Sequence, residues 1–261
     1  MWGLILNENA KIYRRSRTWI FVGIVLLALL ALCMLVRKSI PPSAHVWGLM
    51  NTSSGLITLI TIFAAVVGGD IVAAEFSTGT AKLLFMRPVS RLQILWSKYI
   101  AVLLFALGFV ALLFVASWVL GGLVLGFDGA TTPYQYVGSN QEPAQIPYAS
   151  EVLRSYAFPL VPLVMTLTVS FMISTLFRSS SLAIAVSILL LFAGAVVVTA
   201  LSRYAWDKYI LFANTNLSQY FVGGPSLKGM SLGFSVVVLI VYFVVFHLVA
   251  AIAFRKRDVA V

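Results

Sequence analysis

Charged side chains are scarce in this chain. Only 10% of its 261 residues are Asp, Glu, Lys or Arg, whereas 61% are hydrophobic. A soluble globular domain carries about 25% charged residues, so the composition excludes an ordinary water-soluble domain. The chain is therefore expected to lie in a lipid bilayer.

Cysteine and histidine are almost missing too. Cys33 is the single cysteine, which excludes an internal disulfide framework and a cysteine-based metal cluster within one chain. His45 and His247 are far apart in the sequence, so no metal site is expected. A lone histidine in an apolar span, such as His247, is more often a hydrogen-bonded packing residue than a ligand.

The sequence also lacks the motif of a nucleotide-binding ATPase. No Gly-Lys dipeptide occurs, so the phosphate-binding loop G-x-x-x-x-G-K-[ST] cannot form. An intramembrane transferase or protease would need paired acids, a His–Ser or His–Cys arrangement, or H-E-x-x-H, and no such motif is present. We therefore expect no enzyme activity, no catalytic residue and no cofactor in this chain.

Long hydrophobic runs are what the sequence does contain. A helix needs about 20 apolar residues to cross the hydrocarbon core of a bilayer. Six stretches qualify: 18–36, 52–74, 93–126, 155–177, 182–201 and 231–253. The third is long enough to tilt, or to break near Gly121 and Gly122. The expected fold class is an all-α membrane protein with six transmembrane helices.

The distribution of Lys and Arg predicts the orientation of these spans. One side of the membrane would hold Lys11, Arg14, Arg15, Arg17, Lys82, Arg87, Arg91, Lys98, Arg178, Arg255, Lys256 and Arg257. The other side would hold Arg37, Lys38, Arg154, Arg203, Lys208 and Lys228. The richer side is expected to be cytoplasmic, together with both termini. The net charge of +10 does not indicate nucleic acid, because these residues flank apolar runs and form no polar basic face.

Residues 2–17 are too short and too charged to cross the membrane. As a helix, one side carries Trp2, Ile5, Ile12 and Tyr13. The other side carries Asn7, Glu8, Lys11, Arg14 and Arg15, and Glu8 can reach Lys11. Such a helix would lie in the inner headgroup layer with its basic side toward anionic lipid. The segment could equally be a basic flank that only sets the topology.

A polar segment, EFSTGTAKLLFMRPVSR (75–91), separates the second and third spans on the cytoplasmic side. Ser77 or Thr78 is predicted to cap a short helix over 81–86, which Pro88 would end. Ser90 and Gln93 form a capping-box pattern that would start the third span, with Val89 and Ile94 as the hydrophobic staple. A short helix held stiffly at both ends could transmit force.

One carboxylate, Asp70, lies inside the second span, five residues before Glu75. Acids within a membrane are rare and usually functional. Because Asp70 is close to the cytoplasmic side, we favour a structural acid paired with Arg87, Arg91 or Lys98.

Two parts of the sequence resemble the transmembrane permeases of ABC exporters of the ABC-2 type. The stretch AAEFSTGTAKLLFMRPVSRLQILWSKY, Ala73–Tyr99, resembles their first cytosolic loop. Its matching positions are Glu75, Gly79, Thr80, Leu83, Leu84, Arg87, Pro88, Ser90, Arg91 and Lys98. The opening NENAKIYRRSRTWI resembles the family's first helix at Asn7, Glu8, Lys11, Arg15 and Arg17.

The resemblance implies a single transmembrane domain over 1–261, with an elbow helix at 1–17 and a coupling helix within 75–91. Coupling to an ATPase would involve Glu75, Gly79, Thr80, Lys82, Arg87, Pro88 and Arg91. Two permeases, identical or related, would each dock an ABC ATPase subunit that binds ATP and magnesium. They would export a hydrophobic or amphipathic substrate, such as an antibiotic, peptide or lipid, across a bacterial plasma membrane.

A stand-alone secondary transporter or channel is the alternative. Such proteins often pair interrupted spans in inverted halves. This sequence offers one Gly-rich candidate break, near Gly121, without a clear counterpart.

Overall fold

The computed structural model of the protein describes residues 1–39, 45–79, 89–138, 142–201, 203–204, 206–224 and 229–256. Its helices are α1 (Trp2–Tyr13), α2 (Ser16–Ser39), α3 (Val46–Ser53), α4 (Ile57–Asp70), α5 (Ala73–Ser77), α7 (Arg91–Leu125), α8 (Tyr148–Ala157), α9 (Leu160–Leu176), α10 (Ser180–Leu201), α11 (Leu211–Asn214) and α12 (Leu232–Lys256). Short 3-10 turns cover Ser54–Leu56, Asp207–Tyr209 and Leu217–Tyr220.

The described helices make the chain an all-α membrane protein. When consecutive helical segments are taken together, five helical stretches are long and apolar enough to cross a bilayer. They are Ser16–Lys38, Val46–Ser77, Arg91–Leu125, Tyr148–Leu176 and Leu232–Lys256. The predicted span 182–201 lies in α10, which is not one of these five. A sixth crossing therefore stays a prediction.

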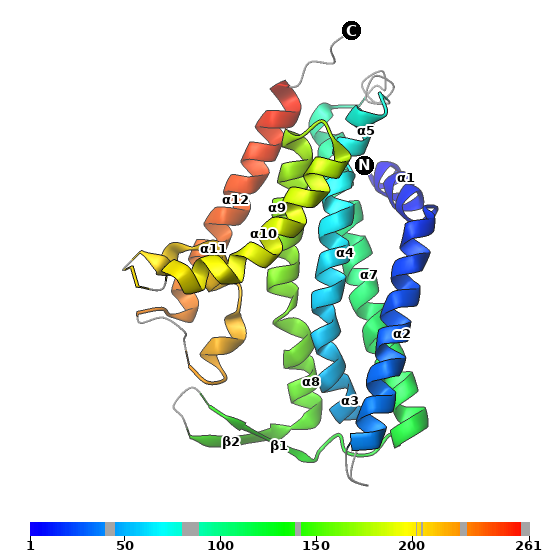
Figure 1. The fold of residues 1–261 in the computed structure, drawn as a ribbon, viewed down its shortest axis with the longest axis vertical. Coiled ribbons are helices and arrows are strands. Elements are labelled where there is room, and N and C mark those ends of the chain that lie inside the picture. The colour runs from blue at the N-terminus through cyan, green and yellow to red at the C-terminus, as the bar shows by residue number, and fades with distance from the viewer. Residues whose placement is uncertain are drawn as a thin grey trace.

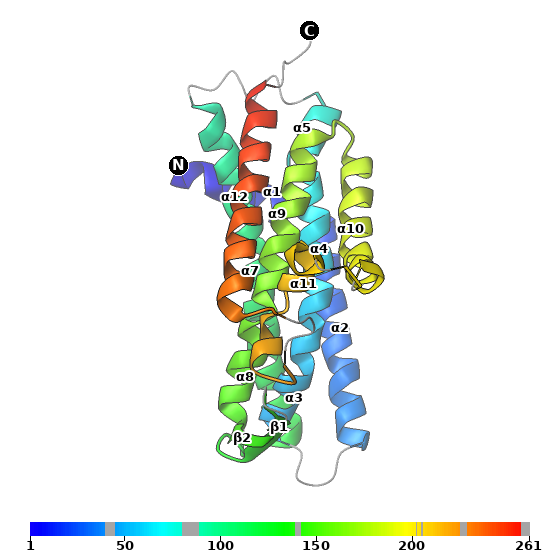
Figure 2. The ribbon, with the colours of Figure 1, turned by 90° about the vertical axis from the view of Figure 1, so that its left-hand side faces the viewer.

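The long helices run side by side and form one elongated bundle (Figure 1). The second span is its centre: 67% of its most apolar stretch is buried, against 22% for α2 and for α12. α4 packs against α7, α9 and α10, while α2 and α12 lie at the sides of the bundle (Figure 2). The two outer helices thus present most of their apolar side chains outward, as expected of a surface in contact with lipid.

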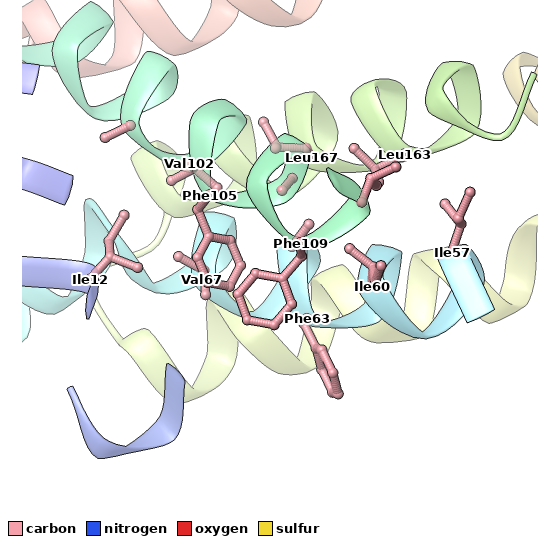
Figure 3. Close-up of a cluster of buried hydrophobic side chains, with 14 of the residues drawn as sticks. Ile12, Ile57, Ile60, Phe63, Val67, Val102, Phe105, Phe109, Leu163 and Leu167 are labelled. Atoms are coloured by element: carbon pink, nitrogen blue, oxygen red, sulfur yellow. The ribbon is translucent and has the colours of Figure 1, made fainter. Parts of the chain in front are cut away.

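Aromatic and branched side chains fill the contact between α4, α7 and α9. Phe63 and Val67 of α4 lie near Phe105 and Phe109 of α7, with Leu167 of α9 beside them (Figure 3). These five side chains are at most 6% exposed.

Small residues bring α4 close to two neighbours. A Cβ atom built on Gly68 would lie 3.4 Å from Cβ of Ser170 in α9. One built on Gly69 would lie 3.3 Å from the carbonyl oxygen of Ala183 in α10. Glycine lets helix backbones approach closely in membrane proteins, so these two positions set the distance between α4 and its partners.

The third span is one continuous helix, so of the two alternatives, a tilt or a break near Gly121 and Gly122, the break is wrong. Both glycines lie inside α7 and are buried. A Cβ atom on Gly121 would lie 3.0 Å from side-chain atoms of Val46 and Leu49 in α3. Gly121 therefore allows α7 to pack closely against α3, and α7 does not bend or break there.

One two-stranded sheet interrupts the helical fold. β1 (Pro133–Val137) pairs antiparallel with β2 (Pro143–Pro147), and Gln135 lies opposite Gln145. The hairpin lies at the end of the bundle formed by α3 and the start of α8 (Figure 1). We call this the hairpin end.

Candidate functional site

The opposite end of the bundle collects most of the residues that the sequence singled out. α1, α5, the first turns of α7, the turn between α9 and α10, and the last turns of α12 all lie there (Figures 1 and 2). We call it the charged end. Two clusters of ion pairs connect these elements.

The first cluster surrounds Lys98, whose side chain is 0% exposed. Its Nζ lies 2.8 Å from Oε2 of Glu8 in α1 and 2.6 Å from Oε1 of Glu75 in α5. Nζ of Lys11 adds contacts of 2.6 Å to Glu8 and 3.4 Å to Glu75. Two ammonium groups and two carboxylates thus balance each other. This Lys98 cluster joins α1, α5 and α7.

The charges within this cluster keep Glu8 ionised. Burial by itself would raise the pKa of Glu8, but the nearby charges of Lys98 and Lys11 and their hydrogen bonds outweigh it. The net result is a pKa below the ordinary value for glutamate. A buried charge is tolerated where its partners are fixed close by, and Glu8 and Lys98 meet that condition for each other.

The second cluster surrounds Asp70, at the end of α4. Arg15 and Ser180 donate hydrogen bonds to its two carboxylate oxygens, and Nη2 of Arg17 lies 2.5 Å from Oδ2. Asp70 is 6% exposed at its side chain. This Asp70 cluster joins the turn between α1 and α2 and the first turn of α2 to the end of α4 and the start of α10.

The partners predicted for Asp70 were wrong as far as the structure describes them. Lys98 binds Glu8 and Glu75, and Nη1 of Arg91 donates to the carbonyl oxygen of Arg255 over 2.9 Å. Arg87 lies outside the described residues. Among the described residues, Asp70 instead pairs with Arg15 and Arg17, which lie at the start of the first span and come beside Asp70 only in the folded chain.

The outward orientation predicted for Glu8 was also wrong. Ile5, Glu8 and Ile12 are 5%, 5% and 4% exposed, whereas Trp2 is 67% and Tyr13 39% exposed. The buried side of α1 thus carries a carboxylate between two isoleucines, because Lys98 on α7 supplies its partner. Asn7, Lys11, Arg14 and Arg15 remain on exposed positions, as predicted.

The segment between the second and third spans is described only at its two ends. Thr80, Lys82, Arg87, Pro88 and the predicted helix over 81–86 lie outside the described residues. Ser77 ends α5, and the hydroxyls of Ser77 and Thr78 donate to the carbonyl oxygen of Ala74. Gly79 follows with a positive φ of 73°, and its N–H reaches the carbonyl oxygen of Phe76 over 3.3 Å. Such a glycine ends a helix in a conformation that other residues rarely adopt.

The predicted start of the third span is confirmed. Ser90 Oγ accepts from the N–H of Gln93 over 3.3 Å, and the Gln93 side chain accepts from the N–H of Ser90 over 3.4 Å. This capping box satisfies two backbone donors at the start of α7. A shallow cleft of about 340 Å³ lies beside it, lined by Ser90, Arg91, Leu92 and Arg255.

His247 packs between α7 and α12. Its Nδ1 lies 2.8 Å from the carbonyl oxygen of Phe243, its ring stacks on Trp96 at 5.0 Å, and the ring of Tyr99 meets it edge-on at 4.5 Å. These contacts agree with the packing role expected for it.

The sequence did not predict that Lys98 pairs with Glu8 and Glu75, or that Ser180 donates a hydrogen bond to Asp70. A lysine flanked by Trp96, Tyr99 and a long apolar run was a usable signal, because an ammonium group at such a depth requires a carboxylate partner. Ser180 carried no comparable signal, since a serine in a short turn is ordinary.

The apolar helices and the buried ion pairs together define a multi-pass helical membrane protein. Within that class, the chain belongs to a family of proteins of unknown function, DUF2705, whose sequence profile matches residues 24–260. The uncharacterized protein YhcI of Bacillus subtilis (strain 168) is 33% identical over 312 residues, covering 100% of both chains. The uncharacterized membrane protein YdbK of the same organism is 29% identical over 259 residues, covering 96% of this chain and 100% of its own.

Proposed function

We propose that the chain is the permease subunit of an ATP-driven ABC exporter of the ABC-2 type, with its charged end in the cytosol. It would move a hydrophobic or amphipathic substrate, such as an antibiotic, a peptide or a lipid, out of the cell. The observation that carries this proposal is the Lys98 cluster, because it fixes the helix before the polar segment 75–91 to the helix after it.

The anchoring of both ends of this segment supports a mechanical role. At the start of the segment, Glu75 is held by Lys98 and Lys11. At its end, the capping box of Ser90 and Gln93 fixes the first turn of α7. A force applied to the segment would therefore act on α1, α5 and α7 together, because separating them exposes buried, unpaired charges at a cost of several kcal/mol.

The proposal assigns ATP and magnesium to a separate pair of ATPase subunits. This chain contains no phosphate-binding loop, so the energy source must be another polypeptide. A second permease, identical or related, would complete the pathway across a bacterial plasma membrane.

The environment of Asp70 weighs against the alternative of a proton-driven secondary transporter. A proton carrier must exchange its charge during transport, and Asp70 is the acid farthest from the end of the second span. Two arginines and the Ser180 hydroxyl hold its carboxylate. These contacts fix the carboxylate in a set of ion pairs and hydrogen bonds, as expected of a structural acid.

The test is purification of the tagged full-length chain from membranes of its own host, followed by mass spectrometry and an ATPase assay. A P-loop ATPase is expected to co-purify, and Gly79→Ala is expected to change ATP turnover of the complex several-fold, because alanine at a φ of 73° strains the end of α5.

Gly23→Ala is the matched control, since a Cβ atom on Gly23 would meet nothing within 4 Å. Purification of the chain without any P-loop ATPase, under conditions that keep other membrane complexes intact, would refute the proposal.

A further inference from the structure

A second polar region lies away from the charged end, toward the hairpin end of the bundle. It is a cavity of about 490 Å³ where the start of α4, α8, the start of α9 and residues 215–222 meet. Small-molecule sites commonly enclose about 300–1,000 Å³. The cavity is thus large enough for an organic ligand.

The lining of this cavity is divided by chemistry. Hydroxyl and amide groups come from Ser54, Thr58, Ser155, Thr215, Asn216 and Ser218. Apolar surface comes from Phe158, Pro159, Pro162 and Val222. A ligand that fills it must therefore carry both a polar and an apolar part.

Two side chains of opposite charge, Glu151 and Arg154, also line the cavity. They lie three positions apart on α8, a spacing at which acids and bases ordinarily pair. No ion pair joins them or links either to another residue in the described parts of the chain. Oε2 of Glu151 and Nη1 of Arg154 are both buried and have no hydrogen-bond partner among the described residues.

Aromatic rings lie near Arg154. Its guanidinium carbon lies 6.0 Å from the centre of the Tyr136 ring and 5.9 Å from that of Phe221. Phe221 in turn stacks on Phe158 at 5.2 Å. Both distances are at the outer limit of cation–π contact, about 6 Å.

These unpartnered atoms point to the chemistry of the missing partner. Leaving a buried polar group unsatisfied costs about 1–3 kcal/mol, and more when the group is charged. Glu151 needs a hydrogen-bond donor, preferably a cation, and Arg154 needs an acceptor, preferably an anion with two oxygens. One molecule that carries both groups satisfies both residues and leaves the net charge of the site unchanged.

We propose that this cavity binds an amphipathic zwitterion. Its phosphate or carboxylate group binds Arg154, its ammonium group binds Glu151, and its apolar part lies against Phe158, Pro159 and Pro162. The site does not depend on the proposed export function, since it needs neither an ATPase nor a second permease.

Binding of four probes to the purified, unaltered full chain in detergent micelles tests the assignment. The probes are a short-chain phosphatidylethanolamine, a phosphatidylglycerol and a cationic lipid with the same acyl chains, and free phosphoethanolamine. Phosphatidylethanolamine is expected to bind at least about tenfold more tightly than each of the others, because it alone offers both charges and an apolar part.

Equal binding of the three lipids would overturn the proposal. Equal binding of free phosphoethanolamine and phosphatidylethanolamine would show that the apolar wall contributes nothing, and would overturn the amphipathic part. This series uses one protein throughout, so the folding of a variant cannot confuse it.

Substitutions locate the site. Arg154→Gln and Glu151→Gln are each expected to weaken binding of phosphatidylethanolamine about tenfold or more, a loss of about 1.4 kcal/mol. Arg203→Gln and Glu142→Gln are matched controls on exposed positions and should leave binding unchanged. If all four variants bind the lipid as the unaltered chain does, the ligand lies elsewhere and the proposal fails.

Discussion

At the scale of single residues, the most informative side chain is a lysine that has no contact with solvent. Lys98 lies in α7 with a carboxylate from α1 on one side and one from α5 on the other. A lone ammonium group at such a position would be expelled or neutralised. Its charge is retained because the carboxylates of Glu8 and Glu75 neutralise it. These three residues therefore stabilise the fold only as a set.

Replacing this lysine by an apolar residue of similar length should be severely destabilising. In Lys98→Met, Glu8 loses its buried partner and keeps the more exposed Lys11, and breaking a buried ion pair costs about 3–5 kcal/mol. The free energy of unfolding in detergent micelles measures the effect. Lys38→Met, on an exposed position of α2, is the control and should stay within about 0.5 kcal/mol of the parent.

The double variant Glu8→Gln/Lys98→Met should recover part of the loss, because it leaves fewer buried charges without a partner. A single variant as stable as the control would show that the Lys98 cluster contributes nothing.

The pKa of Glu8 makes the stability of the charged end dependent on pH. Because its pKa in the folded chain is lowered, the contribution of Glu8 is fully present above the pKa of an unfolded glutamate, about 4.3. It is lost as the pH falls below that value and through the lower folded pKa. Acid unfolding of Glu8→Gln should therefore be less steep below about pH 4.3 than that of the parent.

Unfolding followed by fluorescence between neutral pH and strong acid compares the two proteins, and Glu142→Gln serves as the exposed control. Parallel curves for the parent and Glu8→Gln would contradict the assignment.

At the scale of helices, the sequence predicted features that depend on neighbouring residues. It did not predict contacts between residues that are far apart in the chain. The apolar runs and the capping box of α7 depend on neighbouring residues, so the sequence located them well. The inward side of α1 and the arginine partners of Asp70 depend on contacts across 90 and 55 positions of the chain. A helical pattern of α1 alone places Glu8 with the polar residues, because nothing local reveals Lys98 on the facing helix.

The packing of α4 on α10 yields a prediction for one glycine. A Cβ atom at position 69 would lie 3.1 Å from Oγ of Ser187 and 3.3 Å from backbone atoms of Ala183 and Ile184. Gly69→Ala should therefore push the two helices apart and cost about 1–3 kcal/mol.

Gly23→Ala in α2 is the control, and it should be neutral or slightly stabilising, because alanine favours helix and its Cβ atom meets nothing within 4 Å. Thermal unfolding in the same detergent compares them. Equal stability of the two variants would show that α10 can move away from α4 at no cost.

At the scale of the whole molecule, the two ends of the bundle differ in the charged residues they carry. The charged end holds both ion-pair clusters, and the hairpin end holds the β1–β2 sheet and the cavity near Glu151. The positive-inside rule predicts that the charged end lies in the cytosol.

Labelling of introduced cysteines tests this orientation. In a Cys33→Ala background, which removes the single native thiol, Glu142→Cys should react with a membrane-impermeant maleimide in intact cells. Ser77→Cys, also exposed, should react only after the cells are permeabilised. The reverse pattern would place segment 75–91 outside the cell and would also exclude the proposed coupling to an ATPase.

The position of Lys98 also constrains the order of events while the protein is made. Glu8 and Lys98 are 90 positions apart, so the amino-terminal helix leaves the ribosome long before its partner helix does. A translocon that releases α7 into lipid would have to release an ammonium group with it. Because Glu8 is made before Lys98, its carboxylate is already available to pair with that ammonium group when α7 is released.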